Sequence, residues 1–467
     1  MFVGTHWKAA SLAPGQHNTV SVSFINAMNY NGLFRICSMT LMPIPDLIDS
    51  WLAVSDTVFE FTLHEGILFH NGEILTARDI VASFDYVRNY PYTAHVREGI
   101  VYFEAIDDLT IRIDTVEPYA LLLHDLAHVG NMIMPKSLIE AGHDFTFSAI
   151  GTGPFAFKEY RRGLFMRHMA FENYFDIERS AGLEYIIWKA LPDPTHRGIA
   201  LEISEIDFNV YVTLRDVARL KAHPDIEVRT LASTGHHKLI LNNDNPKFSN
   251  PYVRRAIGMA IDKESAVLAG MSDMAFPTWA SVPTVFQGGT NEGAYSFDPE
   301  AARSLLKKLG IDPATLSFTI VANSDERLRT GEVFRSNLAD IGIDVTVTIF
   351  ERGAQIDDFE ATFDAFNSLT FLGYVRGVFL SDNIESGSNR GRFRNNDVDD
   401  LIRRALATVD NNTRVAIYYD ISRAVNESVP HIPTHMAMIA RAFNANLAVP
   451  EFPPTGALHL NMMYWRD

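Results

Sequence analysis

The alternation of apolar and polar residues is clearest between residues 59 and 88. Apolar and polar positions alternate strictly from 59 to 64, which predicts a strand with one buried face. A short apolar run at 67–69 lies between turn signals and favours a second strand and a tight return. Apolar residues then recur at helical spacing from 80 to 87, behind Thr76, which suits a helix N-cap. The stretch therefore predicts a hairpin followed by a helix.

The second half of the chain carries further strand and helix patterns. Alternation at 317–322, a helical pattern at 327–341 and a second strand at 344–350 predict a β-α-β unit. Two more helices are predicted at 252–263 and at 297–310, and the latter is capped at its start and ends in a glycine.

Composition limits the number of cores and the class of partner. A chain of 467 residues is too long for one ordinary core, so two or three lobes are expected. The 47% hydrophobic and 21% charged content is that of a soluble globular protein. A net charge of −17 argues against nucleic acid and against anionic membrane surfaces as partners. No apolar run reaches the roughly 18 residues that a membrane-spanning helix needs.

The single cysteine and the start of the chain say little about the compartment. Cys37 excludes an intramolecular disulfide and any site built from several cysteines, and it is expected to be a small buried residue. The first residues lack the basic and apolar regions of a secretory signal. A cytoplasmic protein and a mature extracytoplasmic protein both fit this observation.

Several segments together resemble the extracytoplasmic solute-binding proteins of peptide and nickel ABC importers, often called family 5. The segments that carry the resemblance are PDLIDSW at 45–51, GILFHNG at 66–72, IGTGPF at 150–155, VRRAIGMAIDK at 253–263 and the capped helix at 297–310. They occur in the family's order and cover nearly the whole chain.

The resemblance implies an α/β fold, a two-lobed periplasmic-binding-protein clamp (class II-like, cluster C) with an extra subdomain inserted in the first lobe. It places the first lobe at 1–241 plus 437–467, with the insertion at about 21–149. The second lobe is expected at 242–436. The ligand of such proteins binds between the lobes, and closure is a shift of population toward the form that the ligand contacts better.

The function implied by the resemblance is that of the substrate-binding component of an ABC importer, capturing a small peptide or peptide-like solute. Its partners would be that solute and the permease and ATPase subunits, with no nucleic acid, and the protein is expected to be a monomer outside the cytoplasm. No enzyme activity and no cofactor are expected, because nucleophile-elbow and His-Glu-x-x-His motifs do not occur. Binding of a nickel or other metal chelate, or of an opine or oligosaccharide, remains an alternative, as does a hydrolase or sensor on the same scaffold.

The resemblance also suggests residues that recognise the ligand. Peptide-binding relatives carry an acidic loop that pairs with the peptide's amino terminus, and the corresponding stretch here is 369–379. Val375 and Arg376 stand in place of its Asp-Pro pair, so Arg376 is expected to bind a ligand carboxylate. Asp382 could replace the missing anion. The alternative, that Arg376 points to solvent, remains open.

Other candidates are aromatic residues, a second arginine and two histidines. Tyr374 aligns with an aromatic residue of nickel-chelate relatives, whereas His17 and His459 would matter only for a metal chelate. The remaining candidate ligand-binding residues are Phe371, Phe24 and Arg97. The aromatic residues could line a pocket or simply pack.

Overall fold

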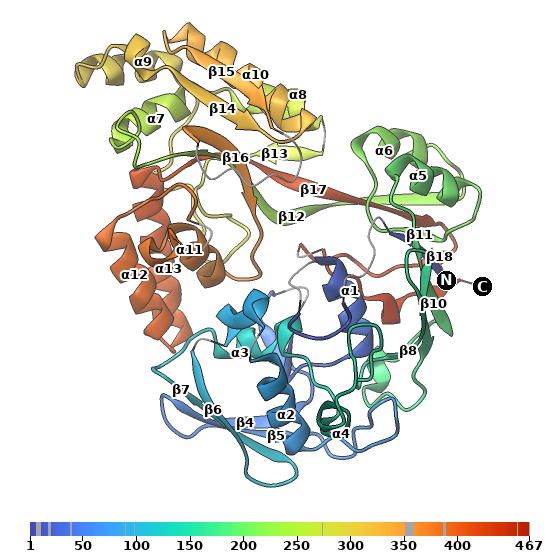
Figure 1. Ribbon diagram of the computed structural model, residues 1–467. Helices are drawn as coiled ribbons and strands as arrows, with labels where there is room; N and C mark the ends of the chain where they lie inside the picture. The colour runs from blue at the N-terminus through green and yellow to red at the C-terminus, as the bar shows by residue number, and fades with distance from the viewer. Residues whose placement is uncertain are drawn as a thin grey trace. The chain divides into compact units, whose positions relative to one another are not determined.

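The computed structural model describes residues 1–5, 11–16, 20–37, 40–88, 90–97, 99–272, 274–350, 359–385, 389–454 and 456–466. The chain forms two compact units (Figure 1). Unit 1 comprises Met1–Leu231 and Ile439–Asp467, and unit 2 comprises Ala232–Met438. The chain leaves unit 1 within strand β12 (Ile226–Leu241) and returns within strand β17 (Ile432–Asn444).

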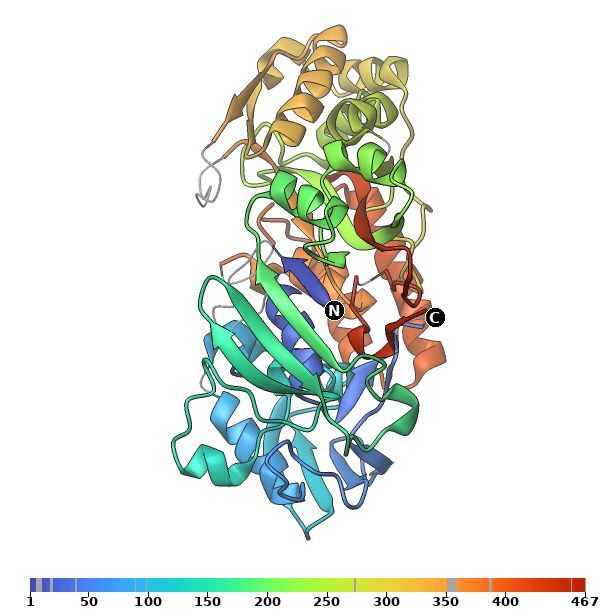
Figure 2. The ribbon, with the colours of Figure 1, turned by 90° about the vertical axis from the view of Figure 1, so that its right-hand side faces the viewer.

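The main sheet of unit 1 is built around its first strand. Strand β1 (Phe2–Thr5) pairs in parallel with β10 (Tyr185–Ala190) and with β11 (Phe208–Asn209). Antiparallel pairing then extends the sheet from β10 to β9 (Phe165–Ala170) and to β8 (Phe155–Arg161), and Figure 2 shows these strands in green.

One hydrophobic core of unit 1 forms around this sheet. Phe155 and Trp188 are buried in it, together with residues of helix α1 (Val20–Asn29). Helices α5 (Pro194–Glu202) and α6 (Leu214–Lys221) contribute to a second cluster. The shorter elements of the chain are β2 (Phe34–Ile36), β3 (Pro43–Pro45), α3 (Leu122–Leu126), α4 (Lys136–Glu140), β13 (Ala275–Pro277), β18 (Leu447–Ala448) and β19 (Tyr464–Trp465).

Unit 1 also contains a separate four-stranded antiparallel sheet. Its order is β4 (Ile48–Ala53), β5 (Val58–Leu63), β7 (Thr110–Thr115) and β6 (Ile100–Ala105). The predicted strand that begins at residue 59 is confirmed as β5, whose alternate residues are buried. The second strand predicted at 67–69 is wrong, because only an isolated bridge joins Leu68 to Ile74. Cys37 is half-buried rather than buried.

Helix α2 (Ala77–Val87) confirms the helix predicted behind Thr76. The carboxylate of Asp79 accepts hydrogen bonds from the backbone N–H and the hydroxyl of Thr76, both at 2.8 Å. Its other oxygen accepts from the backbone N–H of Lys136 at 2.7 Å. Asp79 therefore caps α2 and fixes the start of α4 with one buried side chain.

The Asp79→Ala variant should lower the free energy of unfolding by about 2–4 kcal/mol. The change removes a helix cap and leaves the Lys136 N–H without an acceptor. Urea unfolding would measure the loss, with Asp85→Ala on the same helix as the control. Asp85 is exposed in an ion pair with Arg88, so its loss should change the stability by less than about 1 kcal/mol. Equal losses in the two variants would contradict this account of the cap.

Unit 2 is organised on a mixed sheet. Strand β14 (Phe318–Ala322) pairs in parallel with β15 (Val345–Ile349) and with β16 (Ala361–Phe366). Strand β16 pairs antiparallel with β12, which lies next to β17. Helix α10 (Asp325–Asp340) connects β14 to β15, so the predicted β-α-β unit is confirmed.

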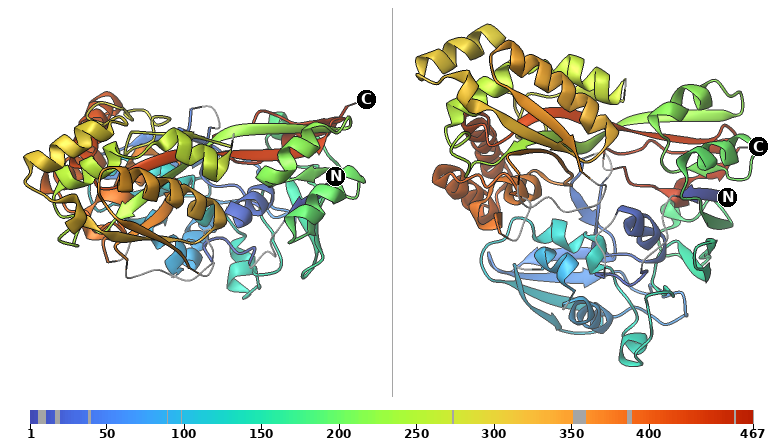
Figure 3. Two further views of the ribbon diagram at one scale, coloured as in Figure 1. Left: turned by 90° about the horizontal axis from the view of Figure 1, so that it is seen from above. Right: turned by 45° about the horizontal axis from the view of Figure 1, so that its top comes forward.

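Two groups of helices flank this sheet, and the right-hand view of Figure 3 shows the first in yellow-green to yellow and the second in orange to red. Alternate residues of β12 pack with α7, α9 and α10 in one apolar core, to which Leu239 and Phe334 belong. The bounds are α7 (Pro251–Met259), α8 (Lys263–Met271) and α9 (Pro299–Lys308) for the first group, and α11 (Phe371–Phe379), α12 (Asn396–Ala407) and α13 (Asn411–Ser428) for the second. No helix among the described residues is long and apolar enough to cross a membrane.

Candidate functional site

The parallel strands β14 and β16 of unit 2 end at the same edge of their sheet. Open α/β sheets bind ligands at the carboxyl ends of their strands, because loops and helix N-termini gather there. Asn323 and Ser324 follow β14, and Asn367 follows β16. We call this region, with the charged side chains around it, the carboxyl edge.

Arg327 brings a guanidinium group to the carboxyl edge from the first turn of α10. Ser324 caps this helix by accepting a hydrogen bond from the Arg327 N–H at 3.3 Å. Nη1 of Arg327 donates to Oδ1 of Asn323 at 2.7 Å and to the Phe363 carbonyl at 3.0 Å. Burial lowers the pKa of Arg327, although Asp364 opposes the shift. Within the described residues Arg327 forms no ion pair, so its Nε and Nη2 donors remain available.

Asp364 supplies the negative charge of the edge, and two cations contact it. Lys238 lies directly opposite in the β12–β16 register, with Nζ 3.8 Å from Oδ2 of Asp364. Arg390 places Nη1 3.3 Å from the other carboxylate oxygen. The Lys238 side chain is only 1% exposed, and burial lowers the pKa of Lys238 to about 8 against the attraction of Asp364. A charge this deeply buried needs such a partner to remain ionised.

Two imidazole rings stack beside these charges. The rings of His237 and His435 lie 4.4 Å apart with an angle of 16° between their planes. Burial, followed by the charges nearby, lowers the pKa of His237 to about 2 and that of His435 to about 4. Both rings are therefore neutral at pH 7. Because their planes are nearly parallel, their in-plane nitrogen lone pairs do not converge on one ion.

Four of the residues singled out from the sequence lie in unit 2, and two of them are core residues. The stretch that was expected to be a loop is helix α11, with Thr370 as its N-cap. Tyr374 is fully buried, and its hydroxyl lies 2.5 Å from Nδ1 of His236. Phe371 stacks on Tyr418 with the ring centroids 4.2 Å apart.

The other two lie at and beyond the end of α11. Arg376 is half-buried in the last turn, and its carbonyl accepts a hydrogen bond from Nδ2 of Asn383 at 2.7 Å. Asp382 is exposed and forms an ion pair with Arg403 of α12 at 3.0 Å. Ligand recognition by these two residues stays a prediction.

The unit 1 candidates are held by contacts within that unit. Phe24 is buried, and the Arg441 guanidinium lies 5.7 Å from the centre of its ring. Arg97 donates to Oδ1 of Asn131 at 2.7 Å and to the Val87 carbonyl at 2.9 Å, and burial lowers the pKa of Arg97 to about 10.

Of the two histidine candidates, the structure describes only His459. Burial lowers the pKa of His459 to about 4, and the positive charges of Arg179, Arg35 and Arg441 lower it further. His17 lies outside the described residues. In the described part of the chain, no group of three or more His, Cys, Asp or Glu residues is arranged to hold a metal ion.

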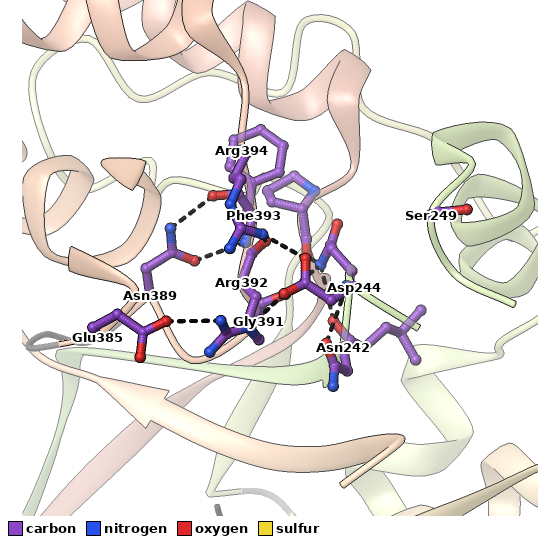
Figure 4. Close-up of polar contacts among 12 residues, drawn as sticks. Asn242, Asp244, Ser249, Glu385, Asn389, Gly391, Arg392, Phe393 and Arg394 are labelled. Carbon is purple, nitrogen blue, oxygen red and sulfur yellow. Dashed lines mark hydrogen bonds and ion pairs between the residues drawn. The ribbon is translucent and has the colours of Figure 1, made fainter. Parts of the chain in front are cut away.

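A second polar cluster of unit 2 lies around Asp244 (Figure 4). Its carboxylate pairs with Arg392 at 2.5 Å and also with Arg394, while Arg392 reaches Glu385 at 2.7 Å. A pocket of about 460 Å³ lies beside it, lined by Asn242, Asp244, Asn245, Pro246, Thr319, Val321, Phe359 and Glu360. Exposed ion pairs of this kind typically contribute less than about 1 kcal/mol each, so the cluster fixes loop geometry more than stability.

The sequence reasoning missed the residues that form the carboxyl edge. The available signal was the run His236-His237-Lys238, which places three polar residues directly before the apolar end of a buried strand. A polar run in such a position calls for partners across the sheet. The identity of those partners depends on strand register, which the pattern alone does not reveal.

The family model for "Bacterial extracellular solute-binding proteins, family 5 Middle" matches residues 42–392. This chain belongs to that family. The match confirms the predicted membership and the α/β fold of the two-lobed clamp type.

Two relatives are similar to this chain in sequence, and one solved structure is similar to it in fold. Di/tripeptide-binding protein 2 of Pseudomonas aeruginosa is 28% identical over 467 residues, covering 92% of this chain and 87% of that protein. Glutathione-binding protein GsiB of Escherichia coli is 25% identical over 439 residues, covering 90% and 85%. The crystal structure of NikZ from Campylobacter jejuni in complex with Ni(L-His) has a TM-score of 0.83 at 21% identity and covers 99% of both chains, which shows a shared fold.

The buried ammonium of Lys238 should make stability depend on pH. Its pKa in the folded chain, about 8, is lower than the roughly 10.4 of an unfolded lysine, so the unfolded chain binds more protons between these values. The parent should therefore gain about 3 kcal/mol relative to Lys238→Met as the pH rises from 7 to 10.5. Urea unfolding of both proteins across this range would measure the gain.

Lys221→Met provides the control, because Lys221 is exposed on α6. The stability difference between parent and control should stay constant over the same range. If the stability difference between the parent and Lys238→Met also stayed constant over this pH range, it would contradict the burial of the Lys238 charge.

Proposed function

We propose that this protein is the substrate-binding component of an ABC importer, which captures a small peptide or peptide-like solute between two lobes and presents it to the permease. Membership of a family of solute-binding proteins supports the transport role. A di/tripeptide-binding and a glutathione-binding relative support the class of solute. The observation that carries the proposal is Arg327, a half-buried cation without an ion-pair partner among the described residues.

The geometry of Arg327 suits a solute carboxylate. Nη1 is held by Asn323 and by the Phe363 carbonyl, so the planar guanidinium has a fixed orientation. The remaining donors, Nε and Nη2, form one edge of the fork and can bind both oxygens of a carboxylate. The first turn of α10 adds its positive dipole end to the same region. These features together favour the carboxylate end of a peptide over an uncharged solute.

We infer binding without turnover as the mechanism. A solute that contacts one conformation better shifts the population toward it, and the importer then recognises that conformation. A location outside the cytoplasm and a monomeric state belong to the same proposal. The metal-chelate alternative finds no support in the stacked His237 and His435 rings, whose lone pairs do not converge. Native mass spectrometry of the purified protein would identify a bound metal complex, opine or oligosaccharide by its mass.

Native mass spectrometry of the freshly purified protein should detect a bound solute and give its mass. Arg327→Ala should then weaken binding of that solute about 30-fold or more in calorimetric titration, because truncating a partly buried, charge-paired side chain typically costs about 2–5 kcal/mol. The matched control is Arg335→Ala, on the same helix but exposed in an ion pair with Glu332. The control should bind the solute like the parent.

Arg376→Ala belongs in the same titration, because the sequence predicts a role for it. A large loss for Arg376→Ala with none for Arg327→Ala would move carboxylate recognition from the carboxyl edge to α11. Parent-like affinity in both variants would contradict recognition of a carboxylate by unit 2. An altered solute mass after incubation would contradict binding without turnover.

A further inference from the structure

The charges of the carboxyl edge are unevenly balanced. Asp364 faces Lys238 at 3.8 Å and Arg390 at 3.3 Å, and its attraction also reaches Arg327. Glu326 attracts Arg327 as well, so three cations (Lys238, Arg327 and Arg390) stand against two carboxylates (Asp364 and Glu326). A solute that arrives at this edge meets a surplus of positive charge, although the whole chain carries −17.

Lys238 cannot leave Asp364 by turning to solvent. Its side chain is 1% exposed, and it lies near the end of β12 directly opposite Asp364. The ammonium lies 5.7 Å from the centre of the Phe366 ring and 5.8 Å from that of Tyr374, within the range of cation–π attraction. Nζ has no hydrogen-bond partner among the described residues, so the ion pair and the two rings hold it.

This arrangement has a consequence for the amino group of a peptide. An ammonium group needs a carboxylate whose charge is not already neutralised. Asp364 is the carboxylate that attracts Arg327 most strongly, and Lys238 and Arg390 already pair with it. The ammonium of a short peptide lies only a few bonds from its carboxylate, so it would face the surplus positive charge that binds the other end.

We propose that Lys238 sets the charge preference of the carboxyl edge. By neutralising Asp364 it makes the edge select carboxylate solutes whose nearby nitrogen is acylated or otherwise uncharged, and it disfavours those with a free ammonium group. The substrate class is therefore N-blocked or net-acidic peptide-like carboxylates. This inference rests on the proposed function.

Two probes, one with a free ammonium group and one acetylated at that nitrogen, would test the preference. N-acetyl-alanyl-alanine and alanyl-alanine share the same carboxylate, and calorimetric titration gives the ratio of their dissociation constants. The parent should bind the acetylated probe at least ten-fold more tightly. Lys238→Met keeps the volume of the side chain and removes the buried one of the two cations that contact Asp364, so it should shift the ratio at least ten-fold toward the free amine. Lys238→Arg, which keeps the charge, should retain the parent's preference.

Lys263→Met is the matched control. Lys263 is another buried lysine of unit 2, 2% exposed, but its Nζ donates to the Thr278 carbonyl at 3.2 Å. Its removal should leave the ratio as in the parent. Asp364→Asn should change the ratio of dissociation constants in the opposite direction. This test does not depend on whether Lys238→Met folds. It removes the anion and leaves the lysine, so it should strengthen the preference for the acetylated probe.

The outcomes separate the two proposals. Equal binding of both probes by the parent, or an unchanged ratio in Lys238→Met, overturns the role of Lys238 and leaves the proposed function in place. Failure of the parent to bind either probe overturns the peptide-like solute itself and the inference with it. A co-purified solute with a free amino group next to its carboxylate end also overturns the inference alone.

Discussion

The register of β12 against β16 is the constraint on which the electrostatics of unit 2 depend. It places Lys238 opposite Asp364 and, in the same ladder, His237 opposite Ala365. Because side chains alternate between the two faces of a strand, a slip of one residue would move Lys238 into the apolar core of α7, α9 and α10. Burial of Leu239 and Leu241 on that core face makes such a slip costly. The apolar core thus fixes the position of the charges.

The same region departs from the usual preference for apolar interiors. Lys238, His236 and Tyr374 are all fully buried or nearly so. Burial disfavours the charged form of both groups, since it lowers the pKa of Lys238 and raises that of Tyr374, so the ionised Lys238 is the group held in an unfavourable environment. Local conflicts of this kind are expected at functional sites, where stability is given up for specificity. The carboxyl edge therefore differs from the Asp244 cluster, whose charges are exposed and already paired.

Sequence patterns predicted the helices and strands that have a strong hydrophobic period. They failed where the structure depends on pairing between residues far apart in the sequence. The β-α-β unit follows from residues 317–350, where the hydrophobic period changes twice. At 369–379 a family loop was transferred onto residues that carry their own helical pattern, with Thr370 as a visible N-cap. The partnership of Lys238 with Asp364 spans more than a hundred residues and depends on register. Composition and local period contain no information about it.

The negative charge of the whole protein and the positive charge of the carboxyl edge act over different distances. At physiological ionic strength, screening limits exposed charges to a range of about 8 Å. The −17 of the chain therefore has little effect on an anionic solute until it is close to the surface. The buried charge of Lys238 and the half-buried charge of Arg327 are screened much less, because protein replaces water around them. An acidic protein can thus select acidic solutes, since the selecting charges are the ones that salt weakens least.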